Sequence, residues 1–271
     1  MKKFLSILMA AAMLLSVCAL SACGGSEEPA PEAEGTEVTE PAEGDAAFTT
    51  LEEGVLIMST NAAFPPYEST TDAGGFEGID IEIATAIAEK LGLELQSDDM
   101  DFDAALLAAQ EGKSDMVMAG LTVNDDRLLV MDFTETYATG VQVVIVPEGS
   151  DVTLDNLGEK MIGTQRGTTG NIYCTDDFGE EHVVAYDDGI AAVNALKNGQ
   201  VDCVVIDNAP AQAFVAANAG LTILDTEYVT EDYAIGVAKG NTALLDAINA
   251  ALVELIEDGT VQSIIDKYIT E

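Results

Sequence analysis

Short apolar runs alternate with helical patterns from about residue 50 to the end of the chain, and this alternation restricts the fold more than any other feature. The predicted strands are 55–59, 93–95, 116–118, 141–146, 160–163, 201–206 and 234–237. The predicted helices are 79–91, 103–110, 190–197, 209–217, 244–257 and 261–268, and residues 167–170 open another. Such a rhythm predicts an α/β fold with mostly parallel sheets flanked by helices. Ligands of these sheets bind at the carboxyl ends of the strands.

The segment around Pro65 and Pro66 is expected to lack regular structure, because proline removes a backbone donor and fixes its own φ angle. Because ligands bind at the carboxyl ends of strands, functional residues are expected directly after the predicted strands.

The N-terminus has the pattern of an export signal. Lys2 and Lys3 precede an apolar run from Phe4 to Leu20, followed by Leu20-Ser21-Ala22-Cys23. This predicts a signal peptide over 1–22. An uncleaved membrane anchor is the alternative, but the run is short for a span. The last four residues resemble the lipobox of bacterial lipoproteins, and the resemblance implies that Cys23 carries lipid.

Residues 23–49 are rich in glutamate, glycine and proline and hold little to bury, which predicts a disordered tether. Lys and Arg total 10 against 49 Asp and Glu, so the formal charge is −39. This charge argues against nucleic acid and anionic lipid as partners, because both require a basic surface. The membrane contact is therefore expected through the lipid anchor only.

Catalytic motifs are missing from the sequence. The single histidine cannot complete a catalytic triad, and neither a phosphate-binding loop nor a metal-ligand spacing occurs, so we expect no metal and no cofactor. Cys174 and Cys203 could form a disulfide or stay as two buried free thiols, and the sequence does not decide between them.

Isolated polar residues after predicted strands are the candidates for a binding site. Arg127 suits a carboxylate, or else pairs with Asp125 or Asp126 at the surface. Thr168 and Thr169 open a helix whose free N–H groups can hold an anion, or they simply cap it.

Asp207 ends an apolar run and suits an ammonium group, or it caps the next helix. Phe64 and Phe102 follow separate strands and could stack on a ligand, although most aromatic residues belong to the core.

These residues fall within motifs that resemble family 3 of the extracellular solute-binding proteins, which serve polar amino-acid ABC importers. The matching stretches are 61–68, 75–81, 100–103, 119–127, 132–137, 167–170, 205–208 and 233–237. Their order and spacing are kept over about residues 50–271.

The resemblance implies a two-lobed, type II periplasmic-binding-protein-like fold with the ligand in the cleft between the lobes. Two crossover strands are expected near 137–141 and 228–234. Lobe 1 would comprise 50–138 plus 233–271, and lobe 2 would comprise 139–232.

The resemblance also implies a role for each candidate. Arg127 matches the arginine that holds the α-carboxylate, assisted by Thr122 and Thr169. Gly120 matches a backbone carbonyl for the α-amino group, and Asp207 matches its carboxylate partner. Phe64 and Phe102 match aromatic residues that enclose the ligand side chain. The complete expected site is Asn61, Phe64, Phe102, Gly120, Leu121, Thr122, Arg127, Gln165, Thr168, Thr169 and Asp207.

Asn61 departs from the family pattern, because aspartate is frequent there in members that bind cationic amino acids and glutamine. This amide and the neutral Gln165 favour a neutral polar ligand such as glutamine, with cystine and arginine left open. The expected partners are a free L-amino acid and permease subunits of an ABC transporter. The expected protein is a monomer, exported and held at the outer face of the cytoplasmic membrane by lipid on Cys23.

Two other classes of function are alternatives to a transport protein. A dehydratase-like enzyme on the same fold would need a spare general acid or base in the cleft. A receptor's sensor domain would need a transmembrane helix and a signalling domain.

Overall fold

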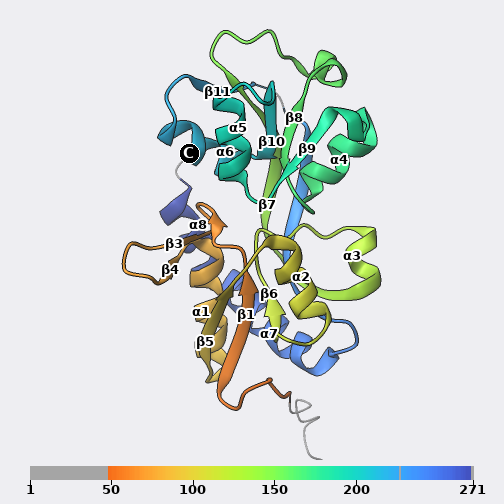
Figure 1. Ribbon diagram of the computed structural model, residues 1–271. Coiled ribbons are helices and arrows are strands. Elements are labelled where there is room, and N and C mark those ends of the chain that lie inside the picture. Colours follow the sequence, from red (N-terminus) through yellow and green to blue (C-terminus); the bar gives the residue numbers. More distant parts are fainter. Residues whose placement is uncertain (1–47, 226, 270–271) are drawn as a thin grey trace, which may run out of the picture. The chain divides into compact units, whose positions relative to one another are not determined.

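The computed structural model describes residues 48–225 and 227–269 (Figure 1). The predicted signal peptide, Cys23 and the tether up to residue 47 lie outside the described residues. Within the described part of the chain, no helix is both long and apolar enough to cross a membrane.

The main sheet has nine strands in the order β5-β1-β6-β12-β7-β10-β8-β9, with β11 paired to β7. Its strands are β1 (Val55–Thr60), β5 (Glu94–Asp99), β6 (Met116–Val117), β7 (Met131–Pro147), β8 (Ile162–Gln165), β9 (Val183–Tyr186), β10 (Cys203–Asp207), β11 (Leu221–Ile223) and β12 (Val229–Ala238). A small sheet contains β2 (Ala63–Phe64), β3 (Glu68–Thr70) and β4 (Phe76–Glu77).

The helices are α1 (Ile79–Leu91), α2 (Phe102–Gln110), α3 (Asp125–Val130), α4 (Thr169–Phe178), α5 (Gly189–Lys197), α6 (Asn208–Ala217), α7 (Thr242–Glu257) and α8 (Thr260–Tyr268). Two 3-10 turns, η1 (Leu154–Glu159) and η2 (Glu180–His182), complete the described elements.

Two groups of parallel strands form the two lobes of the fold (Figure 1). In lobe 1, β1 pairs in parallel with β5 and β6, and α1, α2, α7 and α8 pack around them. In lobe 2, β8 pairs in parallel with β9 and β10, covered by α4, α5 and α6. Each lobe buries its own apolar clusters, and α1 shows why: its isoleucines at positions 79, 83 and 87 recur at helical spacing and are all 0% exposed.

The two lobes share the antiparallel pair β7 and β12. The pairing runs from Val229 opposite Gln142 to Ala238 opposite Met131, with two register shifts. The crossover segments expected near 137–141 and 228–234 lie in this ladder. The lobe boundaries at 138/139 and 232/233 stay predictions.

Short elements depart from the sequence expectation. Residues 61–67 are predicted to be irregular, and Pro65 and Pro66 do lie in a turn, but Ala63 and Phe64 form strand β2, which pairs with β3. A strand of two residues has no periodicity that a sequence can show. The strand predicted at 141–146 is only the end of β7. Earlier residues of β7, among them Thr139 and Gly140, interrupt the apolar pattern.

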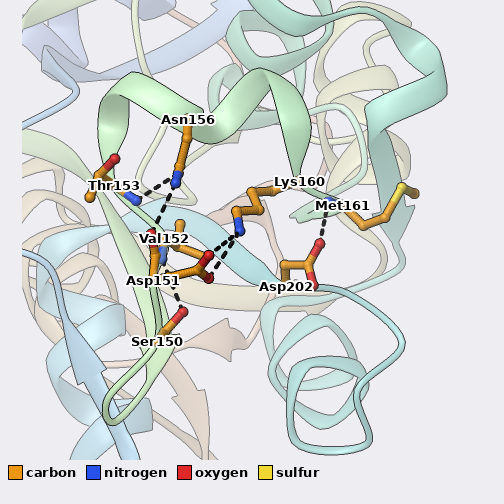
Figure 2. Close-up of polar contacts among 8 residues, drawn as sticks. All are labelled: Ser150, Asp151, Val152, Thr153, Asn156, Lys160, Met161 and Asp202. Carbon is orange, nitrogen blue, oxygen red and sulfur yellow. Dashed lines mark hydrogen bonds and ion pairs between the residues drawn. The ribbon is translucent and has the colours of Figure 1, made fainter.

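Polar contacts hold the loop between β7 and β8, which we call the β7–β8 loop (residues 148–161). Figure 2 shows that Lys160 Nζ lies 3.0 Å from both carboxylate oxygens of Asp151. Asn156 Oδ1 accepts from Thr153 N at 2.8 Å, and Asn156 Nδ2 donates to Asp151 O at 2.9 Å. The Met161 N–H donates to Asp202 Oδ2 at 2.8 Å, which ties the loop to the start of β10.

The cysteines of lobe 2 are both free. Cys174 in α4 and Cys203 in β10 are each 0% exposed and belong to the same apolar cluster. Of the two alternatives left open by the sequence, the structure contains the buried thiols. Burial raises the pKa of each thiol to about 12.

Candidate ligand-binding site

A cavity lies between the two lobes. Its lining residues are Asn61, Phe64, Glu68, Phe102, Ala119, Gly120, Thr122, Arg127, Gln142, Gln165, Thr168, Thr169, Ile206, Asp207 and Tyr233. Ten of the eleven expected site residues are therefore brought together. The exception is Leu121, which is 0% exposed and packs in the core of lobe 1. The roles of these residues toward a ligand stay predictions.

The cavity takes its residues from the carboxyl ends of strands, as the α/β pattern predicts. Asn61 follows β1, and Gly120 and Thr122 follow β6. Gln165 ends β8, and Asp207 ends β10. Both lobes therefore present their strand ends to one space.

Arg127 lines the cavity and has 7% of its surface exposed. Its Nη1 donates to Thr122 O at 2.8 Å, and its Nη2 donates to Gly167 O of lobe 2 at 3.2 Å. The guanidinium carbon lies 5.4 Å from the centre of the Phe102 ring. Burial lowers the pKa of Arg127 to about 10, so the group stays charged at neutral pH. The alternative of an ion pair with Asp125 or Asp126 does not occur among the described residues.

The start of α4 lies near Arg127, which donates to the Gly167 carbonyl just before this helix. Thr168 is the N-cap of this helix, since its hydroxyl accepts from Asn171 N at 3.4 Å and donates to Gln165 O at 2.8 Å. Thr169 lies within 3.4 Å of Thr122 across the cavity, hydroxyl to hydroxyl. Thr168 therefore caps α4 and also lines the cavity.

Asp207 lies in the cavity wall and is 1% exposed. Its Oδ2 accepts from Val141 N and from the Tyr233 hydroxyl, both at 2.8 Å, and its Oδ1 accepts from Ala209 N at 3.1 Å. Asp207 thus caps α6 and also faces the cavity. Burial raises the pKa of this carboxyl to about 6, although the Tyr233 hydroxyl and the two backbone N–H groups lower it.

Asn61 and Gln165 join the lobes directly. The Gln165 Nε2 group donates to Asn61 Oδ1 at 2.8 Å, while Asn61 Nδ2 donates to Met100 O at 2.9 Å. Both polar atoms of the Asn61 amide are therefore used within the protein. Asn61 fixes the orientation of Gln165 and leaves the Gln165 carbonyl oxygen without a partner.

Four buried oxygens on three cavity residues accept no hydrogen bond from any described residue. They are both carboxyl oxygens of Glu68, Gln142 Oε1 and Gln165 Oε1. Burial, and next the nearby Asp80 carboxylate, raises the pKa of Glu68 well above its usual range. Buried acceptors without donors are costly, so a cavity with this lining favours a ligand that supplies N–H groups.

Three polar cavity residues, Glu68, Gln142 and Tyr233, are not among the expected site residues, nor are the apolar Ala119 and Ile206. Gln142 had a detectable signal, because it is the one polar residue in the apolar run 141–146. Glu68 directly follows the aromatic and proline segment, but only the tertiary structure shows that its carboxyl group is buried. Phe64 and Phe102 both line the cavity, and Phe64 also stacks on Tyr67 with ring centres 5.8 Å apart.

The arrangement defines a class of protein: two α/β lobes that enclose a small-molecule cavity with a buried arginine and a buried aspartate in its lining. The chain matches the model of bacterial extracellular solute-binding proteins, family 3, over residues 56–271, and it belongs to this family. Its fold is the type II periplasmic-binding-protein fold.

Several relatives and solved structures are similar along most of the chain. The "Probable histidine-binding protein" of Neisseria gonorrhoeae is 31% identical, covering 100% of this chain and 97% of that protein. The "ABC transporter arginine-binding protein 1" of Escherichia coli is 31% identical, covering 80% of this chain and 91% of that protein. An ancestral arginine-binding protein bound to glutamine has 38% identity and a TM-score of 0.77, covering 81% of this chain and 100% of that chain.

Proposed function

We propose that this protein is the substrate-binding component of an ABC importer and that it captures a free L-amino acid in the interlobe cavity. The observation that carries the proposal is the presence of opposite charges, those of Arg127 and Asp207, in the lining of one cavity. A desolvated zwitterion needs both of its charges matched, because an unpaired buried charge is costly. The similar proteins named for histidine and arginine support the same class of ligand.

The α-carboxylate would lie against Arg127 and the N-terminus of α4. Two of the five N–H groups of the guanidinium already bind backbone carbonyls, which fixes its plane and leaves the others free. Thr122 and Thr169 would add hydroxyl donors beside it. The ammonium group would bind Asp207 and the Gly120 carbonyl.

The ligand side chain would face the unpaired oxygens of Glu68, Gln142 and Gln165. A guanidinium group carries five N–H donors and no acceptor, whereas a glutamine amide carries two donors and one acceptor. Arginine therefore satisfies this lining better than glutamine does. The sequence favoured a neutral ligand because of Asn61, but the Asn61 amide is engaged with Gln165 and Met100 in the structure.

Glu68 gives the proposal a test. Burial raises the pKa of Glu68 well above its usual range, and a guanidinium beside it would lower that pKa, so arginine binding should release more protons than glutamine binding does. Calorimetric titration in two buffers of different ionisation enthalpy measures this proton release directly.

Glu68→Gln should weaken arginine binding by about 1.5–3 kcal/mol, roughly ten- to a hundredfold, and glutamine binding much less. Glu254→Gln is the matched control, since Glu254 pairs with Lys90 at the surface and is 67% exposed. Equal loss for both ligands would show that Glu68 supports the fold rather than the selectivity. No binding of any amino acid by the wild type would refute the function itself.

Binding without turnover is part of the proposal, since the family consists of solute-binding proteins. Incubating the protein with arginine and analysing the mixture for new products checks this point. We also propose export, cleavage after Ala22 and lipid attachment at Cys23, with the protein a monomer at the outer face of the cytoplasmic membrane. Fractionation of the producing cells, followed by detergent partitioning, tests the anchor.

A further inference from the structure

One tyrosine on each crossover strand donates a hydrogen bond to a buried aspartate. Tyr137 in β7 donates to Asp80 Oδ1 at 2.8 Å, and Tyr233 in β12 donates to Asp207 Oδ2 at 2.8 Å. Tyr137 is outside the cavity lining, whereas Tyr233 and Asp207 both belong to it. The second pair therefore connects a strand shared by both lobes with a charged group of the binding site.

The Asp207 carboxylate is held by both crossover strands at once. Its Oδ2 accepts from Val141 N of β7 and from the Tyr233 hydroxyl of β12, while Oδ1 accepts only from Ala209 N. Oδ1 therefore retains lone-pair capacity for a ligand, and Oδ2 is used to fix the position of the group.

The chain leaves room for this arrangement at Gly140. A Cβ atom there would lie 2.4 Å from Asp207 Oδ2 and 2.4 Å from the Tyr233 hydroxyl. These separations are too short for any side chain, so residue 140 must be glycine for the hydrogen bond to form. Tyr233 is itself 1% exposed, and its ring meets Tyr67 edge-on at 5.3 Å.

Several groups face Asp207 and act on its charge. Burial raises the pKa of this carboxyl to about 6, the Tyr233 hydroxyl lowers it most among the hydrogen-bond donors, and Glu231 in β12 raises it. Tyr67, from the segment between β2 and β3, is close enough for its own pKa to be raised by Asp207. Without the Tyr233 hydroxyl, the pKa of Asp207 would rise further toward neutral pH.

We propose that Tyr233 is a positioning residue for amine recognition: its hydroxyl, carried by crossover strand β12, holds the Asp207 carboxylate ionised and aimed at the ligand's ammonium group. This inference rests on the proposed function. It makes recognition of the α-amino group depend on the pairing of β7 with β12, the strands that must bend when the lobes move.

The test compares Tyr233→Phe with Tyr67→Phe. Both changes remove one hydroxyl from neighbouring buried rings, but no hydrogen bond of the Tyr67 hydroxyl is found in the described part of the chain. The ligands are L-arginine and 5-guanidinopentanoate, which is arginine without its α-amino group. Tyr233→Phe should weaken arginine binding about ten- to a hundredfold and 5-guanidinopentanoate binding less than about threefold. Tyr67→Phe should leave both affinities within about threefold.

The pH dependence of the affinity for arginine gives a second readout. A packing defect would not shift its midpoint. Arginine affinity of the wild type should fall as pH drops through about 6, because protonation removes the charge of Asp207. Tyr233→Phe should shift this midpoint upward, and Tyr67→Phe should leave it in place.

Two results would overturn the inference. Equal weakening of both ligands by Tyr233→Phe would assign the residue to packing, and unchanged arginine binding would show that the hydroxyl is dispensable. If the wild type bound neither ligand, the proposed function would fail, and the inference with it. Circular dichroism confirms that each variant is folded.

Discussion

The β7–β8 loop and the interlobe cavity are both rich in polar groups, but they treat those groups differently. In the loop, Lys160 neutralises Asp151, and Asn156 uses its amide on both sides (Figure 2). Asp151 is 86% exposed in its side chain, so water can also serve it. In the cavity, Glu68 and Gln165 keep buried oxygens that no described residue serves.

Polar groups that stabilise the fold can thus be told apart from polar groups that are able to bind a ligand. The loop would gain nothing from a ligand, because its hydrogen bonds are complete without one. A donor-rich ligand would give these buried oxygens hydrogen-bond partners, which favours the bound form. Unpaired buried acceptors therefore identify the site more sharply than charge alone in a chain of formal charge −39.

The largest expected effect comes from removing the cavity's carboxylate. Asp207→Asn should weaken arginine binding by about 2–5 kcal/mol, because the ligand ammonium is left buried without its counter-charge. Asp202→Asn is the matched change outside the cavity: Asp202 is exposed, directly precedes β10 and accepts from Met161 N of the β7–β8 loop. It should leave affinity unchanged in calorimetric titration. Equal effects of the two variants would contradict the distinction between the regions.

A smaller loss is expected from Arg127→Lys. Lysine keeps the charge but cannot reach both the Thr122 and Gly167 carbonyls while presenting a planar fork to a carboxylate. We expect about 1–3 kcal/mol weaker binding by titration. Arg166→Lys serves as the control, because Arg166 is 56% exposed and lies 3.4 Å from Asp187. Binding by Arg127→Lys within twofold of the wild type would exclude Arg127 as the carboxylate clamp.

The smallest effect concerns stability, and the two regions should respond to pH with opposite signs. The pKa of Asp207 is about 6 in the folded protein against 3.8 for a free aspartate, so the folded state binds its proton more tightly. The free energy of unfolding should therefore rise by about 1 kcal/mol from this group as pH falls from 7.5 to 5.

Lys160 lowers the pKa of Asp151, so the stability from that pair is lost only as pH falls below the usual aspartate range. Urea unfolding of the ligand-free protein at pH 7.5 and 5 therefore measures the Asp207 contribution without that of the Asp151 pair, which changes only at lower pH. Asp207→Asn should show a smaller rise than the wild type. A rise of the same size in that variant would assign the effect to other acidic groups.

The sequence predicts the α/β class well because α1 and α7 have clear helical periodicity and the buried strands are nearly continuous apolar runs. The order of motifs also led to Arg127, Asp207 and the start of α4, which meet in one cavity. Each of these residues follows a strand, so the topology alone places them at strand ends.

Other features depend on distances that a sequence does not contain. Glu68 looks like a surface acid in the printed chain, and its unpaired, fully buried carboxyl group exists only after β3 packs under the cavity. The hydrogen bond between Gln165 and Asn61 joins positions 104 apart in the chain, so the sequence does not show that the Asn61 amide is already engaged. The need for glycine at 140 arises from a carboxylate and a hydroxyl that come from two distant strands.

The two free thiols of lobe 2 have a practical consequence. Labelling reagents react with exposed thiolates, whereas Cys174 and Cys203 are fully buried and have a pKa of about 12. Once Cys18 and Cys23 are replaced, a dye would attach only to a cysteine introduced on purpose. Asp103 in α2 offers a suitable place, since its carboxylate lies against Gly167 of the opposite lobe. A fluorophore at that position would turn lobe movement into an optical signal and make the protein a sensor for its own ligand.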